Sequence, residues 1–344
     1  MKIYVTGAYG PSQELESLRE AGHEVVLGRP VDQPGRRPYT EQELVEWCRD
    51  ADVIMASHQD TISRAVLAAS QNLRLVVVPL VGVDKIDVPA ATELGIVVAN
   101  SPTTLDIAAT AEATIALMLM LLKRIKHNES KLRRGEWSRR ADLGWLVAGK
   151  TIGLVGLGRV GAHVARRLQG WEARFLACDP YVAPETARPL QVSLVNLPTL
   201  LADSDVVSLH AALTPKTRGM IGEKELKSMN RAAFLINTAR GELVDEEALC
   251  RAIEGGWIAG AALDTFESEP LPMESRLRTL DPKRVILTPH NAAHSEAGRL
   301  ADLKLAFDAT LSALRGEVPK HTVNPQVVAQ WRQRFGGTKA GRIR

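Results

Sequence analysis

Apolar and polar positions alternate along the chain in two patterns. Short apolar runs typical of strands are separated by stretches with apolar residues three or four positions apart, which predict helices. In the first third of the chain, helices are predicted near residues 12–21 and 41–49, and strands at residues 3–5, 25–27, 53–55, 73–78 and 96–99. Strands that alternate with helices indicate βαβ units around a mostly parallel sheet.

The same alternation begins again after a long helical segment near residues 107–132 and a loop rich in Arg and Trp. The strands predicted there are residues 151–155, 175–178, 206–209, 234–237, 258–263 and 285–287. Six short strands with helices between them fit a doubly wound sheet. Residues 295–314 again predict a helix, and because the second sheet already has its strands, we expect this helix to return to the first domain.

The predicted fold class is therefore α/β, with two Rossmann-like, doubly wound parallel-sheet domains and a cleft between them. A length of 344 residues fits two domains of roughly 150 residues each. The first, flavodoxin-like domain is expected to be discontinuous, comprising residues 1–100 and 295–325, and the second comprises residues 101–294. Residues 326–344 are basic and are expected to form a frayed tail.

The composition of the chain limits which partners and which cellular compartment are expected. Lys plus Arg number 43 against 40 Asp plus Glu, a net charge of +3, so no nucleic-acid partner is expected. The most apolar stretch, residues 115–122, is bounded by charges and too short for a membrane span, so no membrane partner is expected. Three widely spaced cysteines fit neither a disulfide framework nor a metal cluster, and no signal peptide is apparent. These features predict a cytoplasmic protein.

The most specific motif directly follows the strand at residues 151–155. It runs Gly156-Leu157-Gly158-Arg159-Val160-Gly161 and opens a predicted helix. The first Gly permits a tight turn, the second lets the backbone approach a diphosphate, and the third lets helix and strand pack closely. The diphosphate would lie at the helix N-terminus, where free N–H groups favour anions.

Asp179 follows the next predicted strand at about the spacing expected for the acidic residue of a dinucleotide site. Its carboxylate can accept hydrogen bonds from ribose hydroxyls and would repel a 2′-phosphate. The cofactor predicted for the second domain is therefore NAD(H) rather than NADP(H).

Candidate catalytic groups follow three later strands. Hydride transfer to or from a secondary alcohol needs a proton acceptor and a group that polarises the carbonyl. The segments after the strands contain Arg240, then Asp264 and Glu269, then His290. Ligands gather at the carboxyl ends of strands in open α/β sheets, so we expect these segments to converge.

At this point the sequence resembles the D-isomer-specific 2-hydroxyacid dehydrogenases, a family that includes phosphoglycerate dehydrogenase and glyoxylate/hydroxypyruvate reductase. The resemblance extends over almost the whole chain, from residues 81–87 to Val323-Asn324-Pro325. The motifs that carry it, in order, are residues 156–161 with 179–181, residues 204–210, residues 235–245, residues 264–270 and residues 288–290. The family implies a dehydrogenase of D-2-hydroxy acids.

The resemblance also implies roles for individual residues. His290 matches the acid/base histidine, Glu269 the carboxylate paired with it, and Arg240 the arginine that binds the substrate carboxylate and keto oxygen. Asp264 matches a residue facing the nicotinamide carboxamide, and the remaining matches are backbone contacts: Thr238 and Ala239 to the cofactor, and Val81, Gly82 and Val83 to the substrate carboxylate.

Departures from the family pattern bear on the substrate. Asn291-Ala292-Ala293 replaces the usual Ile-Gly-Gly after His290, and no arginine stands near Ser57-His58-Gln59, where phosphoglycerate members carry one. The sequence therefore disfavours phosphoglycerate, and it lacks the residues typical of phosphite and formate dehydrogenases. Glyoxylate, hydroxypyruvate or a related small 2-keto acid is the expected substrate.

Two other functions are also compatible with these motifs. One is an NAD(H)-sensing interaction protein similar to the family's corepressors, which retain the same three side chains. The other is a dehydrogenase of another substrate class on the same scaffold. The helix near residues 107–132 and its Arg-rich extension resemble the dimerising region of relatives, which predicts a homodimer.

Overall fold

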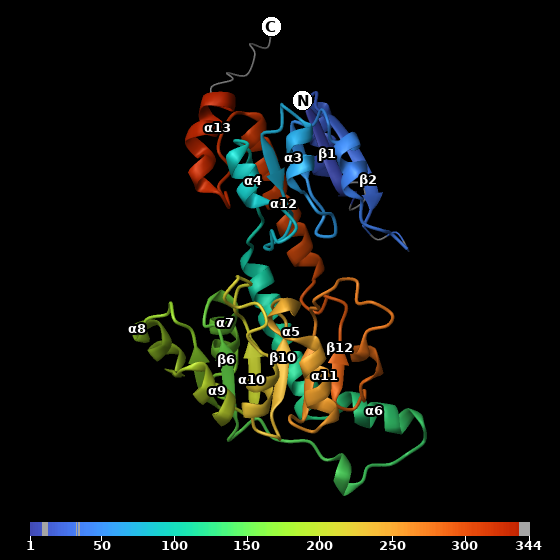
Figure 1. Ribbon diagram of the computed structural model, residues 1–344, viewed down its shortest axis with the longest axis vertical. Coiled ribbons are helices and arrows are strands. Elements are labelled where there is room, and N and C mark those ends of the chain that lie inside the picture. The colour runs from blue at the N-terminus through green and yellow to red at the C-terminus, as the bar shows by residue number, and fades with distance from the viewer. Residues whose placement is uncertain (9–12, 32, 34, 337–344) are drawn as a thin grey trace. The chain divides into compact units, whose positions relative to one another are not determined.

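The computed structural model describes residues 1–8, 13–31, 33 and 35–336 (Figure 1). The chain divides by its internal contacts into two compact units. The first unit contains Met1–Asp106 and Ser295–Arg344, and the second contains Ile107–His294. The chain crosses between them after Asp106, later than the predicted limit at residue 100, and again after His294.

The first unit is built on a five-stranded parallel sheet with the strand order β2-β1-β3-β4-β5. The strands are β1 (Lys2–Ala8), β2 (Glu24–Pro30), β3 (Val53–Met55), β4 (Leu75–Val77) and β5 (Val97–Ala99). The helices are α1 (Gln13–Glu20), α2 (Glu41–Trp47), α3 (Arg64–Ala69), α4 (Val88–Glu93), α12 (Glu296–Leu314) and α13 (Val328–Phe335).

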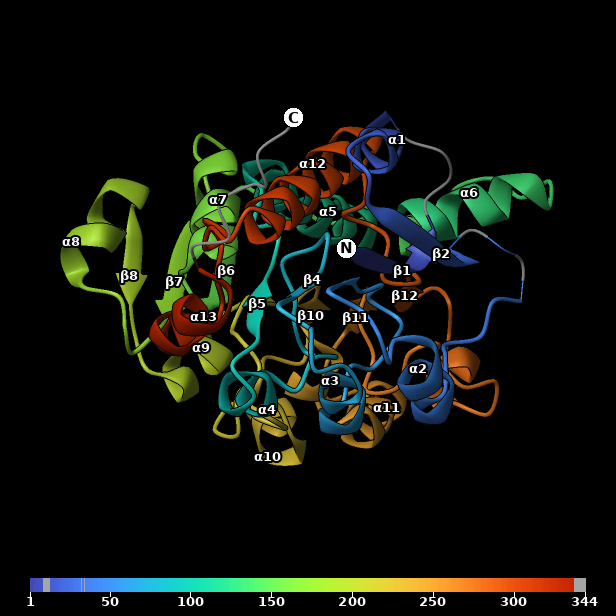
Figure 2. The ribbon, with the colours of Figure 1, turned by 90° about the horizontal axis from the view of Figure 1, so that it is seen from above.

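Helices cover both faces of this sheet because alternate strand residues point to opposite sides. Ile3, Val53 and Leu75 pack with residues of α1, α12 and α13. Tyr4, Ile54 and Val76 pack with residues of α2, α3 and α4 on the other face. Figure 2 shows α1 and α12 on one side of the strands and α2, α3 and α4 on the other. The return of α12 to the first unit agrees with the prediction.

The second unit contains a seven-stranded parallel sheet with the order β12-β11-β10-β9-β6-β7-β8. Its strands are β6 (Thr151–Val155), β7 (Arg174–Cys178), β8 (Val192–Leu194), β9 (Val206–Leu209), β10 (Phe234–Asn237), β11 (Gly260–Leu263) and β12 (Val285–Leu287). The sequence did not predict β8, an edge strand whose central residue is the exposed Ser193, so that no apolar run marks it. The predicted α/β class with two parallel sheets is confirmed.

Helices again cover both faces of the second sheet. One face packs on α9 (Leu197–Asp203), α10 (Glu223–Ser228) and α11 (Glu246–Glu254), and the other on α5 (Thr104–Leu122) and α7 (Arg159–Arg167). A short α8 (Pro184–Ala187) precedes β8. The order of strands reverses between β6 and β9, and this switch point is where open α/β sheets bind ligands beyond the strand ends.

The long helix predicted near residues 107–132 is two helices. α5 ends at Leu122 and α6 (Ile125–Arg133) begins after Arg124, whose φ of 52° is incompatible with a continuous helix. Among the described residues, α5 alone is long and apolar enough to cross a membrane by length and composition. Its residues Ala111, Leu117 and Leu121 instead pack in the core of the second unit.

The predicted frayed tail needs correction up to Phe335. Residues 328–335 form α13, and the Trp331 side chain is fully buried, with its ring N–H donating to the carbonyl of Arg74 at 2.7 Å. The tail's basic composition hid one buried aromatic side chain, which fixes the helix to the first unit. The rest of the predicted tail, residues 337–344, lies outside the described residues.

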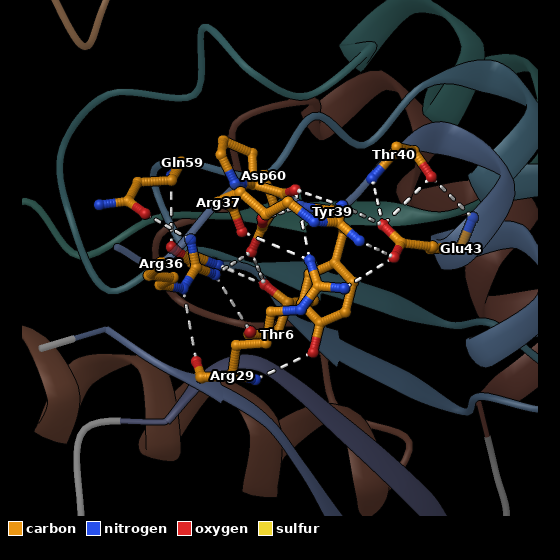
Figure 3. A network of polar contacts seen from close by, with 11 residues as sticks. Thr6, Arg29, Arg36, Arg37, Tyr39, Thr40, Glu43, Gln59 and Asp60 are labelled. Atoms are coloured by element: carbon orange, nitrogen blue, oxygen red, sulfur yellow. Dashed lines mark hydrogen bonds and ion pairs between the residues drawn. The ribbon is translucent and has the colours of Figure 1, made fainter. Parts of the chain in front are cut away.

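A buried ion pair fixes the segment after β2 to the first unit (Figure 3). The side chains of Arg36 and Asp60 are 2% and 0% exposed, and Arg36 Nη2 donates to Asp60 Oδ2 at 2.8 Å. The Thr6 hydroxyl and the Tyr39 amide also donate to this carboxylate, at 2.7 and 3.0 Å. A second Arg36 nitrogen donates to the side chain of Gln59. Burial of the two charges is thus offset by several hydrogen bonds.

Candidate functional site

The glycine-rich turn after β6 has the geometry of a phosphate cradle. Gly156 has a φ of 97°, and a Cβ there would lie 2.8 Å from the backbone of His210. A Cβ at Gly161 would lie 2.3 Å from the carbonyl oxygen of Gly156. Gly158 is the N-cap of α7, and the place of its missing Cβ is open space. Two glycines are therefore required by packing, while the third leaves room for a ligand at the helix N-terminus.

The remaining residues of the predicted dinucleotide site adjoin this turn. Arg159 and Val160 are the first two residues of α7. Asp179 follows β7, and its two carboxylate oxygens accept hydrogen bonds from the backbone N–H groups of Leu157 and Tyr181, both at 2.9 Å. Because each carboxylate oxygen has two lone pairs, Asp179 keeps acceptor capacity for ribose hydroxyls. The residues present therefore fit a dinucleotide.

Arg240 lies in a loop that begins where β10 ends. Its Nη1 donates to the carbonyl of Ala239 at 2.7 Å. A Cβ at Gly241 would lie 1.9 Å from the carbonyl carbon of Phe266, so only glycine allows the Arg240 loop to approach the backbone that leads to Glu269.

Thr238, in the same loop, has a side chain oriented by α5. Its hydroxyl oxygen lies 2.7 Å from that of Thr114. Thr114 in turn donates to the carbonyl of Thr110 at 2.8 Å, and a carbonyl can only accept. Both contacts are hydrogen bonds only if Thr238 donates to Thr114. The Thr238 side chain therefore anchors the loop to α5. The Ala239 N–H and carbonyl already bond to Asn237 and Arg240, so the backbone groups of Thr238 and the second lone pair of the Ala239 carbonyl are what remain for the predicted cofactor contact.

Asp264, directly after β11, holds the turn that carries His290. One of its carboxylate oxygens accepts from the hydroxyl of Thr288 at 2.6 Å and from the amides of Asn291 and Ala292 at 3.2 Å each. These donors flank His290 on both sides. Sequence analysis assigned Asp264 only to the nicotinamide carboxamide, and the structure adds this positioning of the His290 turn.

His290 and Glu269 form a close pair. His290 Nδ1 lies 2.7 Å from Glu269 Oε2, and the other oxygen of Glu269 accepts from the amide of Phe266 at 3.0 Å. The side chains of His290 and Glu269 are 43% and 34% exposed, so both remain accessible. Burial opposes ionisation of Glu269, but the hydrogen bond and charge of His290, with smaller contributions from Phe266 and Arg240, hold the pKa of Glu269 below its usual range. The pair has the arrangement of an acid/base histidine oriented by a carboxylate.

Val81, Gly82 and Val83, the predicted substrate loop, belong to the first unit. The Asn100 side chain donates to the carbonyl of Val81 at 2.7 Å and so fixes the loop. The backbone N–H groups of these three residues make no hydrogen bond with another described residue. They have the donors that a carboxylate cradle needs.

Sequence analysis missed two polar residues that support the site. Asn237 is the last residue of β10 and is 1% exposed, and Thr114 lies on α5 at 2% exposed. The available signal was a polar residue at the end of an otherwise apolar strand, directly before the Arg240 loop. Buried polar side chains require hydrogen-bond partners, and here those partners belong to the loop.

Comparison with known proteins agrees with these features. The NAD binding domain of the D-isomer specific 2-hydroxyacid dehydrogenases matches residues 115–292. A glyoxylate reductase of Thermofilum pendens is 39% identical over 333 residues, which cover 95% of each chain. A D-3-phosphoglycerate dehydrogenase of Methanocaldococcus jannaschii is 39% identical over 85% of this chain, which spans only 55% of that protein. The crystal structure of the TT0316 protein from Thermus thermophilus is similar, with a TM-score of 0.84, 34% identity, and coverage of 94% of this chain and all of that one.

Proposed function

The chain belongs to the D-isomer specific 2-hydroxyacid dehydrogenase family, and we propose that it reduces a small 2-keto acid to the D-2-hydroxy acid with NADH, and catalyses the reverse oxidation. The observation that carries this proposal is the accessible His290–Glu269 pair, with Nδ1 and Oε2 2.7 Å apart. Arg240, whose charge contributes to the low pKa of Glu269, belongs to the same region of the second unit.

In the direction of reduction, NADH held at the turn after β6 would supply the hydride for C2 of the keto acid. Glu269 holds Nδ1 of His290, so Nε2 donates the proton to the keto oxygen as it gains charge. Arg240 binds the substrate carboxylate and polarises the keto group through its fork of donors. In oxidation, His290 takes the hydroxyl proton back, and Glu269 stabilises the resulting imidazolium.

The cofactor site is assigned to the turn after β6. Gly156, Gly158, Arg159, Val160 and Gly161 would receive the diphosphate at the N-terminus of α7. Asp179 would accept hydrogen bonds from the adenosine ribose, which favours NAD(H) over a cofactor with a 2′-phosphate. Backbone groups of Thr238 and Ala239, with the carboxylate of Asp264, would contact the nicotinamide part.

We assign glyoxylate, hydroxypyruvate or a related small 2-keto acid as the substrate. The similar protein from Thermofilum pendens is named a glyoxylate reductase. A phosphorylated substrate needs a cation to bind its phosphate. Arg36 donates to Gln59, in the segment where phosphoglycerate members carry an arginine, but the Arg36 side chain is buried and already paired with Asp60. The backbone N–H groups of Val81, Gly82 and Val83 would hold the substrate carboxylate.

The free cysteines Cys48, Cys178 and Cys250 favour the cytoplasm as the compartment of this protein.

We further propose a homodimer formed through α6 and the segment that follows it. This region exposes large apolar side chains: Leu132 (62%), Trp137 (81%), Leu143 (64%) and Leu146 (69%). Asp142 holds the segment against α6 by accepting from Lys131, from His127 at 2.8 Å and from the Arg139 amide at 2.8 Å. Exposed apolar patches of this kind mark interaction surfaces. Light scattering should give twice the chain mass of 37.5 kDa, and a monomer at micromolar concentration would contradict the assignment.

A substrate panel tests the proposed activity. Purified protein is mixed with NADH and, separately, glyoxylate, hydroxypyruvate, pyruvate and larger 2-keto acids, and absorbance at 340 nm is followed. We expect loss of absorbance with the smallest acids. Tight NADH binding without turnover of any acid would overturn the proposal and favour the NAD(H)-sensing function.

A further inference from the structure

Asn237 connects the strand β10 to the loop that carries Arg240. Its Oδ1 accepts a hydrogen bond from the amide of Ala239 at 3.1 Å, and its Nδ2 donates to the carbonyl of Arg240 at 2.8 Å. Its own backbone carbonyl accepts from the amide of Asp264 at 2.9 Å. One buried residue therefore bonds both the Arg240 loop and the next strand end.

At neutral pH, an amide side chain satisfies both ends of this bridge and a carboxylate of the same size does not. The partners are one N–H group and one carbonyl, so the side chain must accept and donate at the same time. An ionised aspartate can only accept, and its second oxygen would face the Arg240 carbonyl oxygen at about the present distance of 2.8 Å. A serine hydroxyl is too short to reach both partners.

The bridge fixes the backbone from which the Arg240 side chain extends. On the other side of Arg240, Gly241 lies against the backbone of Phe266, where even a Cβ would not fit. The guanidinium itself donates to the carbonyl of Ala239, the residue whose amide Asn237 holds. Loss of the bridge would release the Arg240 backbone on one side while Gly241 still held the other, and the guanidinium would change direction.

We propose that Asn237 is a positioning residue that acts through Arg240, aligning the guanidinium with the substrate. This inference rests on the proposed function. Asn237 also connects the Arg240 loop to the His290 turn. The backbone carbonyl of Asn237 accepts from the amide of Asp264, and the carboxylate of Asp264 holds the His290 turn.

A double-mutant cycle on kcat/KM for the keto acid tests the proposal. Asn237→Asp is measured in the wild-type background and in the background of Arg240→Lys, which keeps the charge but loses the planar fork. We expect Asn237→Asp alone to lower kcat/KM by roughly 10- to 100-fold, the effect of a misplacement of about 1 Å. In the Arg240→Lys background we expect a further loss of less than about threefold, because residues that act as a unit are not additive.

Two further readouts separate positioning from folding. The dissociation constant for NADH, measured by fluorescence, should change less than about threefold in Asn237→Asp, because the aspartate still accepts from the Ala239 amide and the residues assigned to the diphosphate and ribose lie in other loops. The ratio of the variant's kcat/KM to that of the wild type should rise as pH falls, because protonated aspartate regains a donor. Asn230→Asp is the matched control, since Asn230 is an exposed residue whose Oδ1 accepts from the Ala232 amide, and it should leave kcat/KM unchanged.

The outcomes are distinct. An equal fold-loss in both backgrounds would overturn the proposal, because Asn237 would then act independently of Arg240. Asn237→Ser is measured in parallel, and failure of both variants to fold or to bind NADH would show a structural role only and also overturn it. If Arg240→Lys alone leaves kcat/KM unchanged, it is the proposed function of Arg240 that fails.

Discussion

Two acid–base pairs of nearly equal length have opposite surroundings. Arg36 and Asp60 are 2.8 Å apart with side chains 2% and 0% exposed, while His290 and Glu269 are 2.7 Å apart with side chains 43% and 34% exposed. The first, enclosed pair is surrounded by further donors and acceptors, whereas both side chains of the second, open pair remain partly exposed. A short ion pair is therefore no sign of function by itself. What matters is whether it retains capacity to exchange a proton.

The two pairs also differ in backbone conformation, because His290 of the open pair has a positive φ and neither Arg36 nor Asp60 does. His290 has a φ of 51°, one of four described residues other than glycine with a positive φ. Such a conformation costs on the order of 1–3 kcal/mol and persists only where the surroundings enforce it. Asp264 enforces it here by accepting from Thr288, Asn291 and Ala292 around the turn.

Removal of His290, the base of the open pair, should have the largest effect on activity. We expect His290→Ala to lower kcat by roughly 10²- to 10⁴-fold, the usual contribution of a positioned acid/base group. NADH affinity should stay nearly unchanged, because the residues assigned to the diphosphate and ribose lie in other loops. Stopped-flow kinetics and fluorescence titration measure the two quantities. A large loss of NADH binding would show that His290 is structural.

Disruption of the enclosed pair should affect stability instead. Asp60→Ala leaves the buried Arg36 charge without its carboxylate, and we expect a loss of about 3–5 kcal/mol in the free energy of unfolding. The exposed pair Arg64–Glu93 is the control, since both side chains are more than half exposed and Glu93→Ala should cost at most about 1 kcal/mol. Urea unfolding measures both, and equal losses would contradict the distinction between enclosed and open pairs.

Asp302 provides a third case, a buried acid beside another acid. Burial, together with hydrogen bonding and repulsion from Asp106, raises the pKa of Asp302 to about 8. A raised carboxyl pKa costs stability as pH rises from the unfolded-state value near 3.8 to about 8. The Tm of Asp302→Asn should therefore exceed that of the wild type by an amount that grows between about pH 4 and 8. A difference that stayed constant with pH would refute the shift.

The smallest expected effect concerns Asp179, whose carboxylate is bonded to two backbone amides yet keeps lone pairs. Asp179→Ala should raise the ratio of kcat/KM with NADPH to that with NADH by about tenfold, on the order of one hydrogen bond to a charged group. An unchanged ratio would contradict the ribose role. Initial rates with both cofactors provide the measurement.

The sequence predicted the parts of the fold with strong local signals. Buried strands such as β6 and the glycine turn after it are specified by residues adjacent in the chain. The missed features depend on distant partners. α13 is fixed by Trp331, whose ring N–H donates to the carbonyl of Arg74, and β8, which has an exposed serine at its centre, is defined by its pairing with β7. The break between α5 and α6 is set by the φ of Arg124, which its residue type does not predict.

The sequence indicated candidate residue types at the strand ends, but it did not indicate the residues that hold them in place. Arg240, Glu269 and His290 follow strand ends, and their residue types indicate the reaction. The role of Asn237 depends on which backbone groups its amide faces, and that of Asp264 on three donors more than twenty residues away in sequence. Hydrogen-bond direction of this kind comes only from coordinates.

In the proposed reaction, a hydride from NADH reaches C2 of the 2-keto acid while His290 supplies the proton. NADH carrying deuterium at both C4 positions is incubated with glyoxylate and the protein, and the product is analysed by mass spectrometry. We expect glycolate with one deuterium on C2 from the wild type and, over the same time, at least about 10²-fold less from His290→Ala. Glycolate without deuterium would show that the hydride does not come from NADH, and equal labelled product from the two proteins would show that His290 does not supply the proton.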